Sequence, residues 1–339
     1  MHAVNSVHFC YPRNSSFKSW EHETLANVKK EFFAYGIDRE YAWCDSPEEA
    51  TIIVWLESNT FKFSDHIRNV ETEPLLNRFP EKVFCYNYDD HPAGFIDGVY
   101  AQMPHSRFDR GQHRCINLMF QHNELIYDLT DADTQRSPSL LCSFRGSFSH
   151  PIRPAMFKVC EGMASPHALQ IVDKWYNHSE QEKSDFVQEL LDSKFVLCPR
   201  GLAPYSNRTG EAMAAGRVPI IIADDSQNFS GIEMERYALW LKEAEIARLP
   251  ELMLQNESRA GEMGRIARQV WNEKLGRGKR LLNLLNLIME LKENRTAVVD
   301  MDYYRARWHS HEFHRAHGWT LRQRLERKVK QTLRQVVRS

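Results

Sequence analysis

The stretch SKFVLCPRGLAPYSNRTGEAMAAGRVPIIIADD, residues Ser193–Asp225, decides the fold class of this chain. Its apolar run Phe195–Cys198 predicts a buried strand, and the loop 199–204, which contains prolines and a glycine, ends that strand. The alanine-rich segment Arg208–Ala215 predicts a helix, and the β-branched run Val218–Ile222 predicts a second buried strand. A strand, a helix and a strand in this order form a βαβ unit, which implies a parallel sheet and an α/β fold.

The polar residues of this unit gather between the first strand and the first turns of the helix. Ligands of open α/β sheets bind at the carboxyl ends of the strands, and a helix N-terminus there attracts phosphate. Arg200 and Arg208 supply forked hydrogen-bond donors suited to a diphosphate. Either Ser206 or Asn207 can cap the N-terminus of the helix. Glu211 is predicted to accept hydrogen bonds from sugar hydroxyls; alternatively, it pairs with Arg208 on a solvated helix face. The predicted donor-binding residues of this unit are Arg200, Gly201, Ser206, Asn207, Arg208 and Glu211.

The same residues resemble the signature of exostosin-type glycosyltransferases, glycosyltransferase family 47. The resemblance rests on the patterns F-x-L-C-P-R-G, S-x-x-R-x-x-E-A and G-x-V-P-I-I-I-A-D-D and extends over roughly 140–253. It includes the segment 143–147 with a later arginine, and the segments 240–246 and 249–252. The resemblance implies a GT-B architecture, in which two Rossmann-like domains face each other across a cleft, and inverting transfer from a nucleotide sugar. Many members of the family carry a longer N-terminal region with a membrane anchor, which this sequence does not show.

A second polar loop follows the apolar run Leu140–Phe144, which predicts another strand. Arg145 and Gly146 lie just past that strand, and Arg153 follows a few residues later. Gly146 lets the backbone approach a ligand closely, so we expect all three residues to contribute to donor binding. The alternative is that Arg145 forms an ion pair between the domains.

Composition and length favour a plain globular enzyme with more than one domain. The chain has 339 residues, a net charge of −1 and seven cysteines without CxxC spacing. The length predicts two cores, the charge argues against nucleic-acid binding, and the scattered cysteines suit a reducing compartment. We expect an N-terminal Rossmann-like acceptor domain at 1–135 and a C-terminal Rossmann-like nucleotide-sugar domain at 136–300, followed by a helical segment at 301–339. The apolar helix Leu281–Leu291 is expected to close the C-terminal domain.

The predicted acceptor loop follows the strand Val83–Tyr86 in the N-terminal half. An inverting transferase needs a general base, and a carboxylate or a histidine serves that purpose. Asp89, Asp90 and His91 are the predicted catalytic candidates, with His105 behind them. The alternative is that the two aspartates are turn residues that cap the next element.

Two motifs that suggest metal binding are interpreted as structural. Asp131-Ala-Asp133 resembles a DxD metal motif, but it lies in a polar stretch that predicts an interdomain linker. The cluster His309, His311, His314 and His317 lacks cysteine partners and equally suits a helix surface. No metal or other cofactor is therefore expected.

The C-terminal segment 320–339 carries seven Arg or Lys against one Glu, with apolar residues at helical spacing. This pattern predicts a basic amphipathic helix, which either lies on an anionic membrane surface or packs on the protein body. No signal peptide or membrane span is visible, so a cytoplasmic location is expected, with peripheral membrane contact through this segment.

The sequence and the resemblance together predict an inverting glycosyltransferase of cell-surface polysaccharide synthesis. Its donor would be a nucleoside-diphosphate sugar, such as a UDP-sugar, and its acceptor a hydroxyl of a glycan or a lipid-linked glycan. Arginines in place of a metal would stabilise the leaving diphosphate. The alternative is a non-catalytic module that binds a nucleotide or a polysaccharide on the same fold.

Overall fold

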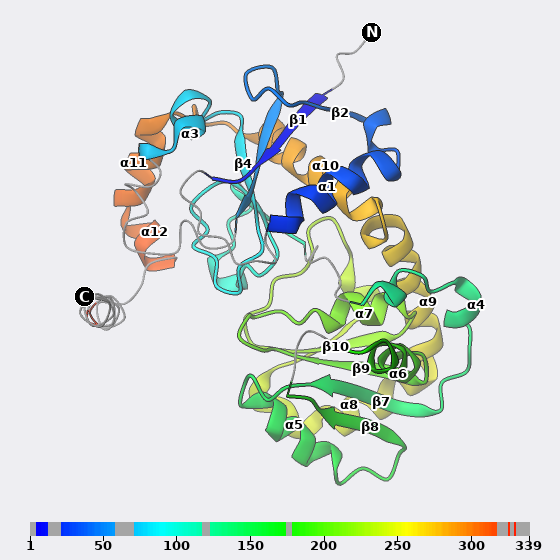
Figure 1. Ribbon diagram of the computed structural model, residues 1–339. Helices are drawn as coiled ribbons and strands as arrows, with labels where there is room; N and C mark the ends of the chain where they lie inside the picture. The colour runs from blue at the N-terminus through cyan, green and yellow to red at the C-terminus, as the bar shows by residue number, and fades with distance from the viewer. Residues whose placement is uncertain are drawn as a thin grey trace, which may run out of the picture.

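The computed structural model describes residues 5–12, 22–57, 71–116, 123–173 and 178–316, together with residues 325 and 329. Within these ranges the chain forms two β-sheets, each flanked by helices, and the second sheet follows the first along the chain (Figure 1). Every strand pair in both sheets is parallel. The structure therefore confirms the predicted α/β class with two Rossmann-like units, the architecture of the GT-B fold.

The first sheet has six strands in the order β2-β1-β3-β4-β5-β6. Residues 52–56 and 83–87, in the two strands at its centre, are buried along their whole length, as parallel strands covered on both faces are. Helices α1 (His22–Ala34) and α3 (Pro74–Arg78) belong to this half. The strands are β1 (Asn5–Cys10), β2 (Tyr41–Trp43), β3 (Ile52–Glu57), β4 (Val83–Asn87), β5 (Gly98–Tyr100) and β6 (His113–Cys115).

The second sheet has the strand order β11-β10-β9-β7-β8, which is the doubly wound order 2-1-3-4-5 read from its other edge. The order reverses between β7 and β9, so the connections that leave these two neighbouring strands run in opposite directions. The strands are β7 (Leu140–Gly146), β8 (His167–Ile171), β9 (Ser193–Pro199), β10 (Val218–Ile222) and β11 (Leu239–Leu241). The helices are α5 (Ile152–Cys160), α6 (Glu180–Leu191), α7 (Arg208–Ala214), α8 (Leu249–Asn256) and α9 (Ala260–Val270).

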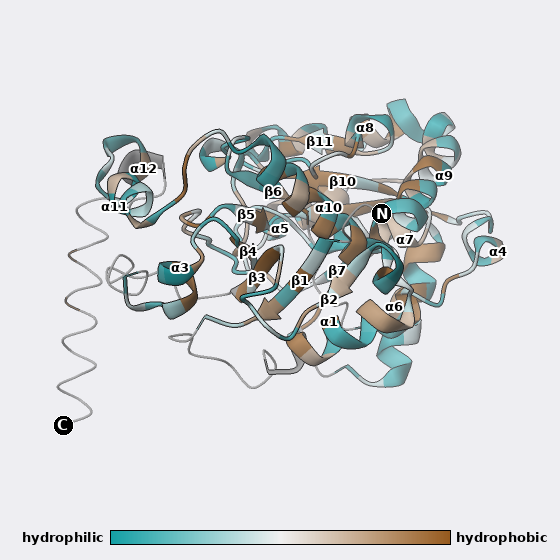
Figure 2. Cartoon of the chain, turned by 90° about the horizontal axis from the view of Figure 1, so that it is seen from above, coloured by the Kyte–Doolittle hydropathy of each residue, from teal (hydrophilic) through white to brown (hydrophobic). Residues whose placement is uncertain are grey.

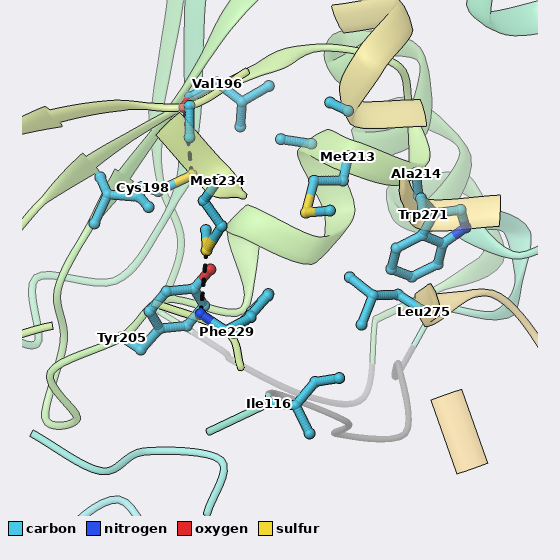
Figure 3. Close-up of a cluster of buried hydrophobic side chains, with 14 of the residues drawn as sticks. Ile116, Val196, Cys198, Tyr205, Met213, Ala214, Phe229, Met234, Trp271 and Leu275 are labelled. Carbon is cyan, nitrogen blue, oxygen red and sulfur yellow. Dashed lines mark hydrogen bonds between the residues drawn. The ribbon is translucent and has the colours of Figure 1, made fainter. Parts of the chain in front are cut away.

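The core of the second half forms where apolar strands meet the helix that follows them. Figure 3 shows Val196 and Cys198 of β9 close to Met213 of α7 and to Met234, with Ile116 from the end of β6 nearby. These side chains belong to one buried cluster that continues into the first sheet on its α1 side. The hydropathy colouring in Figure 2 agrees, since hydrophobic colour concentrates on the strands while outlying helices such as α4 (Asp131–Thr134) are hydrophilic.

The chain returns to the first sheet after the second one is complete. Helix α10 (Lys279–Asn294) packs against β5, β6 and α1, and a separate buried cluster joins α11 (Met301–His309) and α12 (His311–Ala316) to β3 and β4. The sequence predicted that α10 closes the second domain, whereas its apolar face also covers the first sheet. Arg280 of α10 fixes this crossing through Glu31 of α1 and the Tyr127 hydroxyl. None of the described helices is long and apolar enough to span a membrane.

Candidate functional site

The predicted donor-binding residues lie at the carboxyl edge of the second sheet, around the point where the strand order reverses. Arg145 and Gly146 end β7, Arg200 and Gly201 follow β9, and α7 starts at Arg208. In doubly wound sheets this reversal opens a crevice between two loops, where ligands bind. The topology therefore brings together the two arginine-bearing loops that the sequence placed 55 residues apart, since 200 − 145 = 55.

Arg153 ties these two loops to each other. Its Nη1 donates to the Ser147 carbonyl at 2.7 Å, its Nε to the Arg200 carbonyl at 3.1 Å, and its Nη2 to the Pro199 carbonyl at 3.3 Å. Burial, and then the charge of Arg208, lower its pKa to about 10, so the guanidinium is charged at neutral pH. Arg153 thus lies in the predicted region, but its donors are committed to the backbone.

Gly201 lies where side chains of the two loops approach its backbone closely. A Cβ at this position would lie 2.9 Å from Ser149 Oγ and 3.0 Å from Arg153 Nη2. At Gly146 the nearest atom would be Phe144 Cζ, also at 2.9 Å. Both glycines allow the loops after β7 and β9 to pack against Arg153 without a side chain between them.

Arg145 forms an ion pair inside the second half of the molecule. Its Nε and Nη2 lie 3.0 and 2.8 Å from Glu189 Oε2 on α6. Burial raises the pKa of the Glu189 carboxyl, an effect that the arginine partly offsets. The pair joins a strand to a helix of the same sheet, which differs from the interdomain pair that was the alternative.

Arg208 and Glu211 form an ion pair on α7, as the simpler interpretation of their spacing allowed. Glu211 is buried, so this pair does not lie on a solvated face. Arg208 also donates through Nε and Nη2 to the Arg145 carbonyl at 3.0 and 2.7 Å, and its guanidinium lies 4.5 Å from the centre of the Phe186 ring. Arg208 therefore joins α7 to the end of β7.

Ser206 and Asn207 lie just before α7. The Ser206 Oγ accepts a hydrogen bond from the Arg208 amide at 3.4 Å, whereas the Asn207 side chain makes no capping bond to α7 within the described part of the chain. Of the two predicted caps, the structure thus places Ser206 in the closer role.

Arg200 differs from the other three arginines. Its Nε is buried and has no hydrogen-bond partner among the described residues, and its ion-pair partner is Glu243, with Nη1 3.7 Å from Oε1. The second Glu243 oxygen lies 3.9 Å from His150 Nδ1. Burial and the nearby Arg200 charge lower the pKa of His150, which favours the neutral ring at pH 7. Among the described residues, the Arg200 guanidinium therefore makes no hydrogen bond that a ligand would have to displace, apart from its long ion pair with Glu243.

The predicted catalytic loop of the first half is built around a buried aspartate. Asp89 Oδ1 accepts the His91 amide at 2.6 Å, and the Asp89 amide donates to Asn87 Oδ1 at 3.0 Å. Asp89 thus makes the turn that was the alternative to a catalytic role, while Asp90 and His91 are exposed.

The residues of the first half that contact the carboxyl edge of the second sheet come later in the same loop region. The His105 amide donates to the Asp225 carbonyl at 3.2 Å, and Ser106 donates to the Asp225 carboxylate through its amide at 2.7 Å and its hydroxyl at 2.6 Å. Pro104 and Ser226 form an antiparallel bridge beside them. Sequence reasoning named His105 as a candidate, and it placed Asp225 and Glu243 within the matched motifs without giving either a role.

The two metal-like motifs have structural partners. Asp133 completes a capping box with Thr130 at the start of α4, and Asp131 lies 3.2 Å from Arg268. His309 and His311 are exposed, and the other two histidines of that cluster fall outside the described side chains. Among the described residues, no three His, Cys, Asp or Glu side chains gather as a metal site requires.

Comparison with known proteins identifies the segment that contains this edge. Residues 99–255, from β5 into α8, match the exostosin GT47 domain. A probable glucuronosyltransferase of Oryza sativa subsp. japonica is 30% identical over 80 residues, which are 23% of this chain and 18% of that protein. The probable glucuronoxylan glucuronosyltransferase IRX7 of Arabidopsis thaliana is 42% identical over 52 residues, 15% of this chain and 12% of that protein. The matched segment thus spans less than a fifth of either plant relative.

Solved structures resemble the chain at low identity. An alpha1,3-fucosyltransferase covers 86% of this chain and 91% of its own at 11% identity and a TM-score of 0.42. A glycosyltransferase from Rickettsia africae covers 88% and 100% at 10% identity and a TM-score of 0.43. The sequence match, the parallel sheets and the resemblance of the Arg200 and Arg208 motifs agree with one another, and residues 99–255 are therefore similar to the exostosin GT47 domain.

Proposed function

We propose that the protein is an inverting glycosyltransferase that moves a sugar from a nucleoside-diphosphate sugar to a hydroxyl of a glycan or a lipid-linked glycan. The observation that carries the proposal is Arg200, a partly exposed cation whose side chain makes no hydrogen bond among the described residues, at the point where the strand order of the second sheet reverses. A guanidinium binds phosphate oxygens with forked hydrogen bonds and keeps its charge at any physiological pH. The plant relatives are named as probable glucuronosyltransferases, which makes UDP-glucuronic acid the first donor to test.

In this mechanism the second half binds the donor. The diphosphate lies against Arg200, and Arg208 adds positive charge beside it while staying bonded to the Arg145 carbonyl. Glu211 orients the ribose or the transferred sugar. Because charge grows on the diphosphate as its bond to the sugar breaks, these arginines stabilise the transition state more than the ground state.

The first half supplies the acceptor site and the general base. The base removes the proton of the acceptor hydroxyl while that oxygen attacks the anomeric carbon from the side opposite the diphosphate, and inversion follows. Asp89, Asp90 and His91 remain proposed members of this acceptor site. The reaction is proposed to run without a metal ion, because fixed guanidinium groups neutralise the leaving group. UDP release that persists in EDTA would support this proposal. Loss of UDP release in EDTA that Mg²⁺ or Mn²⁺ restores would contradict it.

Calorimetry with UDP, combined with a UDP-release assay on UDP-glucuronic acid, UDP-glucose and UDP-N-acetylglucosamine, tests the proposal. The wild-type protein should bind UDP and release it from one donor. Arg200→Ala should weaken UDP binding by at least tenfold and leave the melting temperature nearly unchanged, since the one ion pair that Arg200 makes with another described residue is long. Arg248→Ala is the matched control, because Arg248 pairs with Glu245 on the segment that starts at Glu243. UDP binding without turnover on any donor would favour the non-catalytic module, and absence of UDP binding would refute the donor site.

Location and membrane contact are also proposals. The basic segment 320–339 lies outside the described residues except at 325 and 329. We propose that it brings the protein to an anionic membrane surface in the cytoplasm, where lipid-linked acceptors would be available. Sedimentation with vesicles that contain phosphatidylserine, compared between the full chain and a chain ending at residue 319, would test this contact.

A further inference from the structure

We propose that His105 is the general base of the transferase reaction and that Gln227 positions it; this inference rests on the proposed function above. The two residues come from opposite halves of the molecule and meet at the carboxyl edge of the second sheet. His105 lies in a short helical turn (His105–Arg107) of the first half, and Gln227 lies in the loop after β10. Their side chains approach to 2.8 Å, between His105 Nδ1 and Gln227 Oε1.

The hydrogen bonds around Gln227 decide which nitrogen of His105 carries the proton. The Gln227 Nε2 donates to the Asn228 carbonyl at 3.3 Å, so the amide oxygen Oε1 faces the imidazole. An amide oxygen only accepts hydrogen bonds. Nδ1 must therefore be the protonated nitrogen of the neutral ring, and Nε2 keeps a lone pair that can accept a proton.

The backbone around His105 is held firmly enough for a catalytic group. The Asp225 carboxylate receives both the amide and the hydroxyl of Ser106, and the Asp225 carbonyl receives the His105 amide. The antiparallel bridge between Pro104 and Ser226 holds the same two segments together. The ring is nevertheless exposed, so an acceptor can reach it. A fixed backbone with an exposed, oriented ring is what a general base requires.

The distance to the proposed phosphate site also fits. Asp225 is the third residue after Ile222, and the Ile222 carbonyl accepts the Arg200 amide at 3.0 Å. Three residues span at most about 11 Å, and the hydrogen bonds at the two ends, of 3.2 and 3.0 Å, raise the upper limit between the His105 and Arg200 amide nitrogens to about 17 Å. A base must lie about 3 Å from the acceptor oxygen, which itself lies about 3 Å from the anomeric carbon. A sugar attached to a diphosphate at Arg200 can occupy that interval.

The step balances as a single displacement. The acceptor oxygen gives its proton to His105 Nε2 and forms a bond to the anomeric carbon. The bond between the anomeric carbon and the phosphate oxygen breaks, and its electron pair leaves with the nucleoside diphosphate. The imidazolium, stabilised through the Nδ1–H bond to Gln227, then returns its extra proton to water.

Two measurements on the full chain test the proposal. Long-range ¹H–¹⁵N NMR of protein labelled at histidine reports the tautomer of His105, assigned by its loss in His105→Gln. We expect the Nδ1–H form in the wild type and a shift toward Nε2–H in Gln227→Ala, which removes the acceptor. Predominance of the Nε2–H form in the wild type would overturn the proposal whether or not a donor has been identified.

The second measurement separates binding from chemistry. Calorimetry with UDP and UDP release from UDP-glucuronic acid are compared in wild type, His105→Gln and the control His178→Gln, which changes a histidine paired with Glu182 at the start of α6. His105→Gln should bind UDP within twofold of wild type and release UDP about 10² to 10³ times more slowly. Full UDP release by His105→Gln would overturn the base assignment. So would a result in which Asp89→Asn or His91→Ala loses UDP release while His105→Gln keeps it. Failure of the wild type to bind UDP would instead refute the proposed function, and the NMR result would still decide the tautomer.

Discussion

Glu243 occupies the position of an internal counter-ion to the proposed phosphate site, so removing its charge should strengthen anion binding. Its carboxylate lies 3.7 Å from Arg200 and 3.9 Å from His150, and its amide is held by Asp224 at 2.9 Å. An arriving diphosphate must compete with this carboxylate for Arg200. Glu243→Gln keeps the shape of the side chain and removes only the competing charge.

The size of the effect follows from the distance and the exposure of the pair. At 3.7 Å two unit charges interact by about 1 kcal/mol in water and by about 4 kcal/mol at an effective dielectric constant of 20. Both side chains keep about a fifth of their surface exposed, and ion pairs of that kind contribute up to about 1 kcal/mol in practice. We therefore expect inorganic pyrophosphate to bind about fivefold more tightly to Glu243→Gln than to the wild type.

Calorimetry with pyrophosphate at low and high ionic strength measures the change. The gain in affinity should shrink at high salt, because screening weakens the pair that the substitution removes. Glu245→Gln is the matched control, since Glu245 lies on the same short helix but pairs with Arg248. Unchanged affinity in Glu243→Gln would refute the competition, and weaker binding would show that Glu243 holds Arg200 in its binding position.

Three further predictions concern the fold. Gly98→Ala should lower the free energy of unfolding by about 3 kcal/mol in urea titrations, because the new Cβ would lie 2.1 Å from the Cys85 carbonyl oxygen. Gly261→Ala is the control and should not destabilise the protein, because the space around Gly261 is open. Asp225→Asn should cost about 1 kcal/mol by thermal unfolding and speed proteolysis between the halves, since it weakens two bonds to Ser106; unchanged proteolysis would contradict this role. Burial raises the pKa of the Cys115 and Cys198 thiols to about 12. The unfolded chain therefore loses these protons first, and stability should fall as pH rises from about 9 to 12, a fall that replacing both cysteines by alanine should reduce.

The strands and the grouping of arginines at one edge of the second sheet were predictable from sequence because both depend on short-range pattern. The apolar runs at 195–198 and 218–222 become β9 and β10, because a strand covered on both faces must be apolar along its whole length. The arginines at 145 and 200 follow such runs directly, and parallel strands bring their carboxyl ends to one edge. Position after a strand was therefore enough to group them.

The partners of those arginines were not predictable, because they depend on packing between distant elements. Glu189 lies in the last turn of α6 with no local signal, and it meets Arg145 only because α6 packs on β7. The position of helix α10 was not predictable for the same reason. An apolar face indicates that a helix is buried, but it does not indicate which sheet the helix packs against. The contact between His105 and Gln227 joins residues 122 positions apart, and it arises from the way the two halves meet.

The pairing of the four arginines changes how mutations at this edge should be interpreted. Arg153 and Arg208 donate to backbone carbonyls at the ends of β7 and β9 and just beyond them, so they hold this edge together as well as adding charge to it. Removing either would take these donors from partly buried carbonyls, which costs stability and weakens the contact between the two loops. A loss of activity at these positions therefore cannot identify a phosphate contact. Arg200 makes no side-chain hydrogen bond among the described residues, so a loss of UDP affinity at this position, with an unchanged melting temperature, reports the ligand contact itself.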